Sequence, residues 1–343
     1  MNATPLLEAR NVTKVFASRG TIGARGTTTV AVNQASLAIH ATPPSIVAIA
    51  GESGSGKTTL SRLLLGLISP TSGEVFYRGR PMEAIKGAER MAFRRDVQAI
   101  FQDPFEVYNP FYRVDHALEV PIRRFEPHKS AAERRALIEQ ALDVVGLRVD
   151  ETLGRYPHQL SGGQRQRVMV ARALMLNPSI IVADEPVSMV DASLRASILE
   201  SLLNAHDQRD IAIIYITHDL TTAYQVCTSI LMMYSGAMVE VGSVEPVIKD
   251  PLHPYTQLLV GSIPLPDPTR RWAAVQASSS AAGQYSTTQG CPYAPRCPQV
   301  MDICRTEAPP LYAVSANRAV ACYLYRGAPA VATEDVSALY IGA

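Results

Sequence analysis

Short apolar runs, each closed by a polar residue, are the most regular pattern in this chain. They cover residues 46–50, 97–101, 180–183 and 211–217. Runs that are apolar on both faces predict strands buried in a parallel sheet that helices cover. The first run ends at a glycine-rich turn, and the others end at Gln102, at Asp184 and Glu185, and at His218. Because ligands of such sheets bind beyond the carboxyl ends of the strands, we expect these polar groups to meet at one edge.

The remaining pattern predicts regions of different character. Residues 6–40 are β-rich, and residues 230–241 have the pattern of a β-hairpin. Helical patterning replaces strand patterning at about residues 103–165, where Ser130 and Glu133 have the spacing of a capping box. We therefore expect an α/β protein with a mostly parallel core sheet, an antiparallel β subdomain and a helical subdomain.

The turn after the first apolar run has the composition of a phosphate-binding loop. It reads Gly-Glu-Ser-Gly-Ser-Gly-Lys-Thr over residues 51–58 and leads into a helical pattern. Glycines allow successive backbone N–H groups and the positive end of a helix to converge on phosphate oxygens. Lys57 is expected to reach the β- and γ-phosphates, and the Thr58 hydroxyl is expected to bind Mg²⁺. The candidate nucleotide-binding residues are Gly51, Glu52, Ser53, Gly54, Ser55, Gly56, Lys57, Thr58 and Thr59.

Polar residues at the other strand ends could complete a hydrolytic site. Asp184 is suited to bind Mg²⁺, and Glu185 is suited to orient or deprotonate the attacking water. Gln102 and His218 are candidates for sensing the γ-phosphate and its water, and Gln102 is a further candidate Mg²⁺ ligand. An isolated acidic pair is often only a solvated strand end. His218 also precedes Asp219 at a predicted helix start, so a role in capping that helix stays open.

A second helix start carries two glycines but no lysine. Residues 160–164 read Leu-Ser-Gly-Gly-Gln, in which Ser161 and Gln164 have the spacing of a capping box. With Gly162 and Gly163, this bare helix N-terminus is a second candidate anion site. One nucleotide has a single γ-phosphate, which the first loop already binds. We therefore expect this helix to bind the nucleotide of another copy or a paralogue, although the spacing alone is also that of an ordinary helix start.

Composition narrows the class of protein. The length of 343 residues predicts about two domains. The 32 Lys and Arg against 31 Asp and Glu leave no basic field that would favour nucleic acid or an anionic membrane. The first residues lack the basic and apolar regions of a signal peptide, and the apolar runs are far shorter than the ~20 residues that span a bilayer. A soluble intracellular protein is expected, tied to a membrane only through a partner.

Four cysteines gather near the C-terminus, at Cys291, Cys297, Cys304 and Cys322. A zinc ribbon has cysteine pairs about two to four residues apart, and this spacing lacks them. A [4Fe–4S] cluster accepts varied spacings, so it is the favoured hypothesis, with Zn²⁺ and free or disulfide-bonded thiols as alternatives. Cys227 lies apart in an apolar segment and is expected to be a buried structural thiol.

In this order along the chain, these motifs resemble those of the ATP-binding subunit of ABC transporters. The resemblance covers roughly residues 6–262 and maps residues 51–58 to Walker A, Gln102 to the Q-loop, residues 160–164 to the ABC signature, Asp184 to Walker B, Glu185 to the catalytic carboxylate and His218 to the H-loop. Asp191 matches the D-loop, although Met189 and Val190 replace its usual Ala-Leu. Phe16 resembles the A-loop aromatic that stacks on adenine, with a core position as the alternative.

A narrower resemblance follows the cassette. Residues 251–256 read Pro-Leu-His-Pro-Tyr-Thr and precede a Cys-Pro-x5-Cys-Pro pattern. Together they are similar to the C-terminal extension of dipeptide and oligopeptide importer ATPases, a group that includes nickel and some oligosaccharide importers. The resemblance implies Mg²⁺-dependent ATP hydrolysis at the cytoplasmic face of the membrane, energising uptake of di- or oligopeptides. It also implies two permease subunits, a second ATPase subunit, identical or different, and an extracytoplasmic solute-binding protein.

The expected domains are a cassette at 1–262, a linker at 263–289, a cysteine module at 290–326 and a tail at 327–343 for which we find no pattern. One rival class is a non-transport ABC ATPase of DNA repair, chromosome architecture or translation. Such proteins carry long coiled coils, paired cassettes in one chain or strongly basic arms, and none of these is visible in the sequence. A second rival is a redox-responsive regulatory module in which the ATP site is secondary.

Overall fold

The computed structural model describes residues 4–17, 28–103, 108–188, 190–263 and 289–340. The chain forms two compact units, each assembled from separate stretches of sequence. The helical unit comprises Met1–Leu7, Ile39–Ile46 and Phe76–Ile216, and the phosphate-loop unit comprises Glu8–Ala38, Val47–Val75 and Thr217–Ala343. Each unit has its own part of the predicted site.

Parallel strands form the core of the helical unit. β7 (Ile180–Asp184) pairs with β6 (Val97–Ile100) on one side and with β8 (Ala212–Thr217) on the other. Every residue of β7 and β8 is buried, which confirms the prediction of strands that are apolar on both faces. Because the strands are parallel, their carboxyl ends share one edge, from which the chain continues into Gln102, Glu185 and His218.

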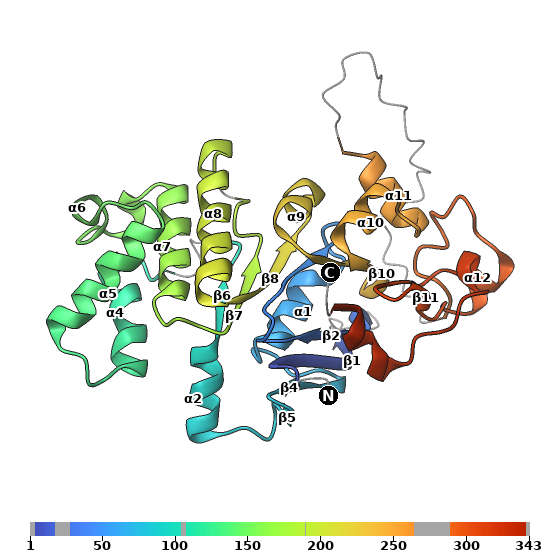
Figure 1. The fold of residues 1–343 in the computed structure, drawn as a ribbon, viewed down its shortest axis with the longest axis horizontal. Helices are drawn as coiled ribbons and strands as arrows, with labels where there is room; N and C mark the ends of the chain where they lie inside the picture. The colour runs from blue at the N-terminus through green and yellow to red at the C-terminus, as the bar shows by residue number, and fades with distance from the viewer. Residues whose placement is uncertain (1–3, 18–27, 104–107, 189, 264–288, 341–343) are drawn as a thin grey trace, which may run out of the picture. The chain divides into compact units, whose positions relative to one another are not determined.

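Helices make up most of this unit, as the sequence predicts. In chain order they are α2 (Gly87–Asp96), α4 (Val114–Phe125), α5 (Ala131–Val144), α6 (Val149–Thr152), the short helix η1 (Pro157–Gln159), α7 (Gly162–Leu174) and α8 (Ala192–Arg209). α7 contacts α4, α5 and α8, and Figure 1 shows α4, α5 and α6 as a group next to α7. The predicted capping box at the start of α5 is present, with Ser130 Oγ accepting from Glu133 N–H at 3.2 Å.

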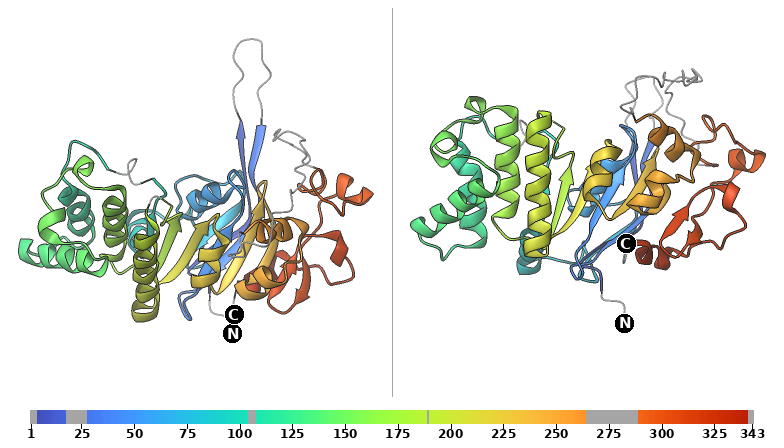
Figure 2. Two further views of the ribbon diagram at one scale, coloured as in Figure 1. Left: turned by 90° about the horizontal axis from the view of Figure 1, so that it is seen from above. Right: turned by 45° about the horizontal axis from the view of Figure 1, so that its top comes forward.

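The phosphate-loop unit contains a mixed sheet. β3 (Ile46–Ala50) pairs in parallel with β9 (Ser229–Tyr234), which forms the predicted antiparallel hairpin with β10 (Ala237–Ser243). β10 then pairs in parallel with β2 (Thr28–Ile39), and β1 (Leu7–Ala17) lies next to β2. Figure 2 shows β1 and β2 as a long adjacent pair. β4 (Ser72–Tyr77), which follows β1 in the sheet order, also pairs with β5 (Arg80–Pro81), and α1 (Lys57–Leu64) follows β3.

The C-terminal segment packs onto this same unit. Its helices are α9 (Leu220–Val226), α10 (Val244–Lys249), α11 (Pro254–Gly261) and α12 (Asp302–Thr306), with short helices η2 (Tyr323–Tyr325) and η3 (Thr333–Tyr340). β12 (Arg318–Val320) pairs with β10 and with β11 (Tyr312–Ser315), so the cysteine module extends the sheet of the cassette. Nearly all of the predicted linker, residues 264–288, lies outside the described residues.

The tail, for which we found no sequence pattern, is anchored. The side chain of Tyr340 in η3 is only 3% exposed, and its hydroxyl donates to Ser36 O in β2 at 3.3 Å. Among the described helices, none is both long enough and apolar enough to cross a bilayer.

Candidate functional site

The glycines of the phosphate loop, which joins β3 to α1, are required by close backbone contacts. Gly51 and Gly56 have φ values of 152° and 101°. A Cβ at Gly51 would lie 2.2 Å from Met233 O, and one at Gly56 would lie 2.2 Å from Ala31 O. The adjacent strands therefore approach the loop too closely for any side chain at these two positions.

Lys57 is held inside this loop. Its side chain is buried, and Nζ donates to Gly51 O at 2.7 Å and to Glu52 O at 2.9 Å. Glu52 O also accepts from Ser55 N–H at 3.1 Å, and Ser55 O accepts from Gly236 N–H at 2.9 Å in the β9–β10 turn. The loop is thus fixed by its own lysine and by the neighbouring hairpin.

The start of α1 fits an anionic ligand. Its N-cap residue, Gly56, is left-handed and supplies no side-chain hydrogen bond to the first turn. Ser55 Oγ is buried and has no hydrogen-bond partner among the described residues. Uncapped N–H groups, a buried ammonium group and an unsatisfied hydroxyl together provide donors for phosphate oxygens. The predicted strand, glycine turn and helix are confirmed, whereas the role of each residue toward a nucleotide stays a prediction.

The strand ends of the helical unit bring Gln102 and Glu185 together. Gln102 Nε2 donates to Glu185 Oε2 at 2.9 Å, across 83 positions of sequence. Glu185 has a positive φ of 47°, which is rare for a residue with a side chain, and its N–H donates to Ile216 O at 2.9 Å. Such backbone strain is typical of functional sites. Asp184, at the end of β7, is only 6% exposed.

The second predicted anion site is a capped helix start. Ser161 Oγ accepts from Gln164 N–H at 3.2 Å, and Gln164 Oε1 accepts from Ser161 N–H at 2.9 Å, so the predicted capping box is confirmed. Gly163 also has a packing role that the sequence did not predict. It is buried, and a Cβ there would lie 3.0 Å from Leu194 Cδ1 in α8. Its small size therefore permits close packing of α7 on α8.

Three further candidates have distinct environments. His218 is exposed after β8, and α9 is capped by Asp219, whose Oδ1 accepts from Thr221 N–H at 2.9 Å. The cap is thus supplied by Asp219 and not by His218. Phe16 is 46% exposed with Lys14 Nζ 5.4 Å from its ring centroid, so the alternative of a core phenylalanine is wrong. Asp191 is exposed at the start of α8.

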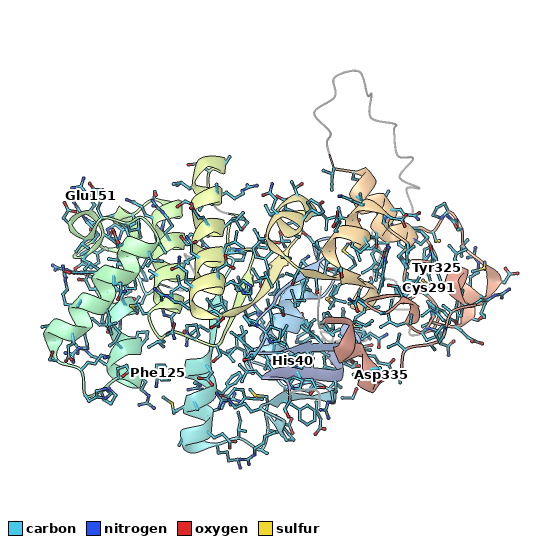
Figure 3. The ribbon with its side chains drawn as sticks, in the orientation of Figure 1. His40, Phe125, Glu151, Cys291, Tyr325 and Asp335 are labelled. Carbon is cyan, nitrogen blue, oxygen red and sulfur yellow. The ribbon has the colours of Figure 1, made fainter. Side chains whose placement is uncertain are left out.

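The predicted metal centre in the cysteine module is not supported. Among the described residues, no group of three or more His, Cys, Asp or Glu side chains is arranged to hold a metal ion. Cys304 packs in an apolar cluster with Tyr312 and Tyr323. Cys291 and Tyr325, which are labelled in Figure 3, also pack against this cluster. Burial raises the pKa of the Cys291 thiol to about 11.

The cysteines are free thiols in this structure, so the disulfide alternative is wrong. Cys227 is buried beside α9, as expected, and burial raises the pKa of its thiol. Sequence reasoning missed one contact of the phosphate loop. Arg296 of the cysteine module forms an ion pair with Glu52 of the phosphate loop, 244 positions away. No local pattern marks such a pair.

Comparison with known proteins gives two family matches. A family model described as ABC transporter matches residues 32–188, and one described as Oligopeptide/dipeptide transporter, C-terminal region, matches residues 239–304. The second match includes three of the four clustered cysteines, Cys291, Cys297 and Cys304.

Individual relatives and a solved structure agree with these matches. A probable peptide ABC transporter ATP-binding protein of Sinorhizobium fredii is 40% identical over 284 residues, covering 83% of this chain and 79% of the relative. The dipeptide transport ATP-binding protein DppF of Haemophilus influenzae is 33% identical over 320 residues, covering 93% of this chain and 97% of the relative. A dimeric ATP-binding cassette with ADP and Pi bound has a TM-score of 0.62 at 29% identity, covering 69% of this chain and 98% of that one.

Proposed function

Because this chain belongs to the family of ATP-binding subunits of peptide ABC transporters, whose members hydrolyse ATP to power transport, we propose a role for each part of its site. Residues 51–59 bind the phosphates of ATP, and Phe16 stacks on the adenine. The observation that carries this assignment is the uncapped start of α1 together with buried Lys57 and the unsatisfied Ser55 hydroxyl. Anion binding at a helix N-terminus needs such donors.

Hydrolysis is assigned to residues at or directly after the ends of β6, β7 and β8. Glu185 orients and deprotonates the attacking water, and its hydrogen bond from Gln102 Nε2 fixes the carboxylate. His218 contacts the γ-phosphate. Thr58, Gln102 and Asp184 hold Mg²⁺, which neutralises charge on the phosphate oxygens when bound.

A complete site is proposed to need two cassettes. The capped start of α7 has no lysine, so Ser161, Gly162, Gly163 and Gln164 act on the nucleotide held by a second cassette, with Asp191 at the same interface. Support comes from the solved cassette with ADP and Pi, which is described as dimeric. The second cassette is another copy of this chain or a related subunit.

The permease partners are proposed to dock on the helical unit. Large apolar side chains are exposed there, with Phe111 at 86%, Tyr112 at 51% and Val120 at 46%. Large apolar side chains exposed in this way are typical of a protein contact. Gln102 lies shortly before these residues in the chain, and we propose that it links the γ-phosphate to transport.

The transported solute is proposed to be a di- or oligopeptide, delivered by an extracytoplasmic binding protein to two permease subunits. The chain itself lies at the cytoplasmic face of the membrane. Relatives named for peptide or dipeptide transport favour this solute over nickel or an oligosaccharide.

Recovery of partners from membranes tests this assembly. A tagged full chain is purified from detergent-solubilised membranes, and the associated proteins are identified. We expect a permease with the wild-type chain and with Leu324→Ala, which removes an exposed apolar side chain of the cysteine module. Phe111→Ala should lose it. Equal recovery with Phe111→Ala would refute the docking surface, and recovery of no membrane protein with the wild-type chain would count against the importer assembly.

We further propose that Cys291, Cys297, Cys304 and Cys322 bind a [4Fe–4S] cluster, with Zn²⁺ as the alternative. Support comes from their sequence spacing and from Cys291 N–H donating to Cys304 O at 2.8 Å. Metal analysis and visible absorbance after anaerobic purification test the proposal. Iron should be present in the wild-type chain and in Cys227→Ser, and lost in Cys297→Ser. A wild-type chain that binds neither iron nor zinc would contradict it.

A further inference from the structure

The side chain of Arg296 connects the cysteine module to the phosphate loop. Its Nη1 donates to Glu52 Oε2 at 3.0 Å and its Nη2 donates to Glu52 Oε1 at 3.2 Å, so the guanidinium binds both carboxylate oxygens. Both side chains are 37% exposed, so the pair is partly shielded from solvent. A two-point contact between guanidinium and carboxylate fixes the orientation of both groups, which a single hydrogen bond would not do.

Aromatic side chains hold the guanidinium in place. Its central carbon lies 5.7 Å from the ring centroid of Tyr234 and 5.8 Å from that of Tyr293. Tyr234 ends β9, whereas Tyr293 belongs to the cysteine module and is 2% exposed. Contact with these two rings, of which Tyr293 is buried, restricts the guanidinium, so the arginine side chain loses less conformational freedom when it forms the ion pair. Arg296 is therefore pre-organised toward the loop.

Tyr255 supports the same loop residue from α11. Its side chain is fully buried, and its hydroxyl accepts from Glu52 N–H at 2.7 Å. His253 Nδ1 accepts from Tyr255 N–H at 3.0 Å, and burial lowers the pKa of His253 to about 4, so the imidazole is neutral at pH 7 and can accept this bond. Tyr255 also lies 4.7 Å from Tyr234 between ring centroids.

The module that carries Arg296 is itself firmly attached. Arg318 of β12 forms a buried ion pair with Glu240 of β10 at 2.7 Å, and Glu240 is fully buried. The Glu240 carboxylate also accepts from the backbone N–H groups of Leu252 and His253, at 3.1 and 3.0 Å. Breaking a buried pair of this kind strongly destabilises a fold, so β12 and the segment before α11 are held to the same strand.

Glu52 connects these supports to the lysine that is assigned to the phosphates. Its carboxylate binds Arg296, its N–H binds Tyr255, and its carbonyl oxygen accepts from Lys57 Nζ at 2.9 Å. A shift of Glu52 would therefore move one of the two carbonyl oxygens that orient Lys57. Loss of Arg296 would also leave an unneutralised carboxylate on a loop that binds a highly charged anion, which is unfavourable.

We propose that Arg296 is a positioning residue for the ATP site, through which the cysteine module sets the conformation and charge of the phosphate loop. The inference rests on the proposed assignment of residues 51–59 to ATP. It gives the C-terminal extension a role in nucleotide affinity that depends on the Arg296–Glu52 contact and not on any group that the cysteines hold. The module then tunes ATP binding without contacting ATP.

The test compares ATP affinity and turnover of full-length variants. Arg296→Ala should raise the KM for ATP about three- to fivefold, the range expected for loss of a partly exposed ion pair, with kcat changed less than about twofold. Arg296→Lys should have a KM for ATP between those of the wild-type chain and Arg296→Ala, because it keeps the charge but not the two-point contact. Arg305→Ala, in the exposed part of α12, is the matched control and should leave both constants unchanged.

A double-mutant cycle provides a readout that general destabilisation would not mimic. Arg296→Ala and Glu52→Gln should have effects that are not additive, because both remove the same contact. Additive effects, or an Arg296→Ala enzyme that matches Arg305→Ala, would overturn the inference. If Arg296→Ala does not fold, a double-mutant cycle of Arg296→Lys with Glu52→Gln tests the same contact.

Failure of the ATP-site assignment has a different signature. Lys57→Ala should weaken ATP binding by roughly 10–100-fold. If Lys57→Ala binds ATP normally, the assignment of the loop itself is wrong. If Lys57→Ala binds ATP more weakly while the Arg296 variants match the control, only the further inference is wrong.

Discussion

Helices α1 and α7 both begin at glycine-rich turns, but they satisfy their first backbone N–H groups differently. α1 follows a left-handed Gly56 and has no side-chain cap, whereas α7 begins with a reciprocal capping box between Ser161 and Gln164. Lys57 is buried beside the first helix start, and the second has no lysine within its glycine turn. The first therefore leaves its donors for a ligand, while the second satisfies part of its own.

This difference supports the proposal of an ATP site divided between two chains. An uncapped helix end with a buried ammonium group can bind phosphate by itself. A capped end with no lysine is a weaker anion site, and it becomes useful only when another chain presents a nucleotide to it. We therefore expect substitutions at the start of α1 to weaken ATP binding, and substitutions at the start of α7 to abolish hydrolysis while ATP still binds.

Ser161→Arg should give the largest difference between the effect on ATP hydrolysis and the effect on ATP binding. The substitution removes the cap and puts a bulky cation on the exposed start of α7, which blocks approach of a second cassette. Steady-state hydrolysis should fall below detection, while ATP affinity of the isolated chain stays within about twofold of wild type. Equilibrium binding of a fluorescent ATP analogue and phosphate release measure the two quantities. Loss of binding in this variant would show that α7 acts on the nucleotide of its own chain.

Glu185→Gln should separate binding from chemistry at the strand ends. The amide keeps the size of the side chain but cannot accept the proton of water, so kcat should fall by roughly 10²–10⁴-fold. ATP should still bind and should accumulate on the protein. Rapid-quench measurement of bound ATP and ADP checks this result. A variant with wild-type turnover would remove Glu185 from the role of base.

Lys57→Ala is the matching change at α1. Loss of charged hydrogen bonds to phosphate should weaken ATP binding by roughly 10–100-fold. The variant must be compared with wild type by thermal unfolding without nucleotide, because Lys57 also binds Gly51 O and Glu52 O. An unchanged affinity would contradict the assignment of the loop.

The smallest effects are expected when one of the two capping boxes is removed. Ser161→Ala and Ser130→Ala each remove a confirmed helix cap and should lower the free energy of unfolding by about 1 kcal/mol. Only Ser161→Ala should reduce hydrolysis, since Ser130 caps α5 away from the assigned site. Chemical denaturation and phosphate release measure both changes. Equal activity of the two variants would mean that Ser161 serves the helix alone.

Local features of this fold could be predicted from the sequence. Capping boxes join residues three positions apart, and buried strands are continuous apolar runs, so α5, α7, β7 and β8 follow from patterns in short windows. The glycine loop belongs to the same class, because its residue types already dictate a sharp turn before a helix.

Features that depend on distant contacts could not be predicted. Arg296 and Glu52 are 244 positions apart, and Tyr340 in the tail reaches Ser36 over 304 positions. Gly163 is another example, since its need for a small side chain comes from Leu194 in a different helix. The cysteine spacing likewise does not determine whether four sulfur atoms converge, because tertiary packing decides that.

Complementation between two inactive variants tests the divided site most directly. Lys57→Ala has an intact α7 start but a damaged phosphate loop, and Ser161→Arg has the reverse. Mixing them should restore ATP hydrolysis, because a mixed dimer contains one site with an intact loop from one chain and an intact α7 from the other. Mixtures that stay inactive, although ultracentrifugation detects mixed dimers with ATP, would contradict the account.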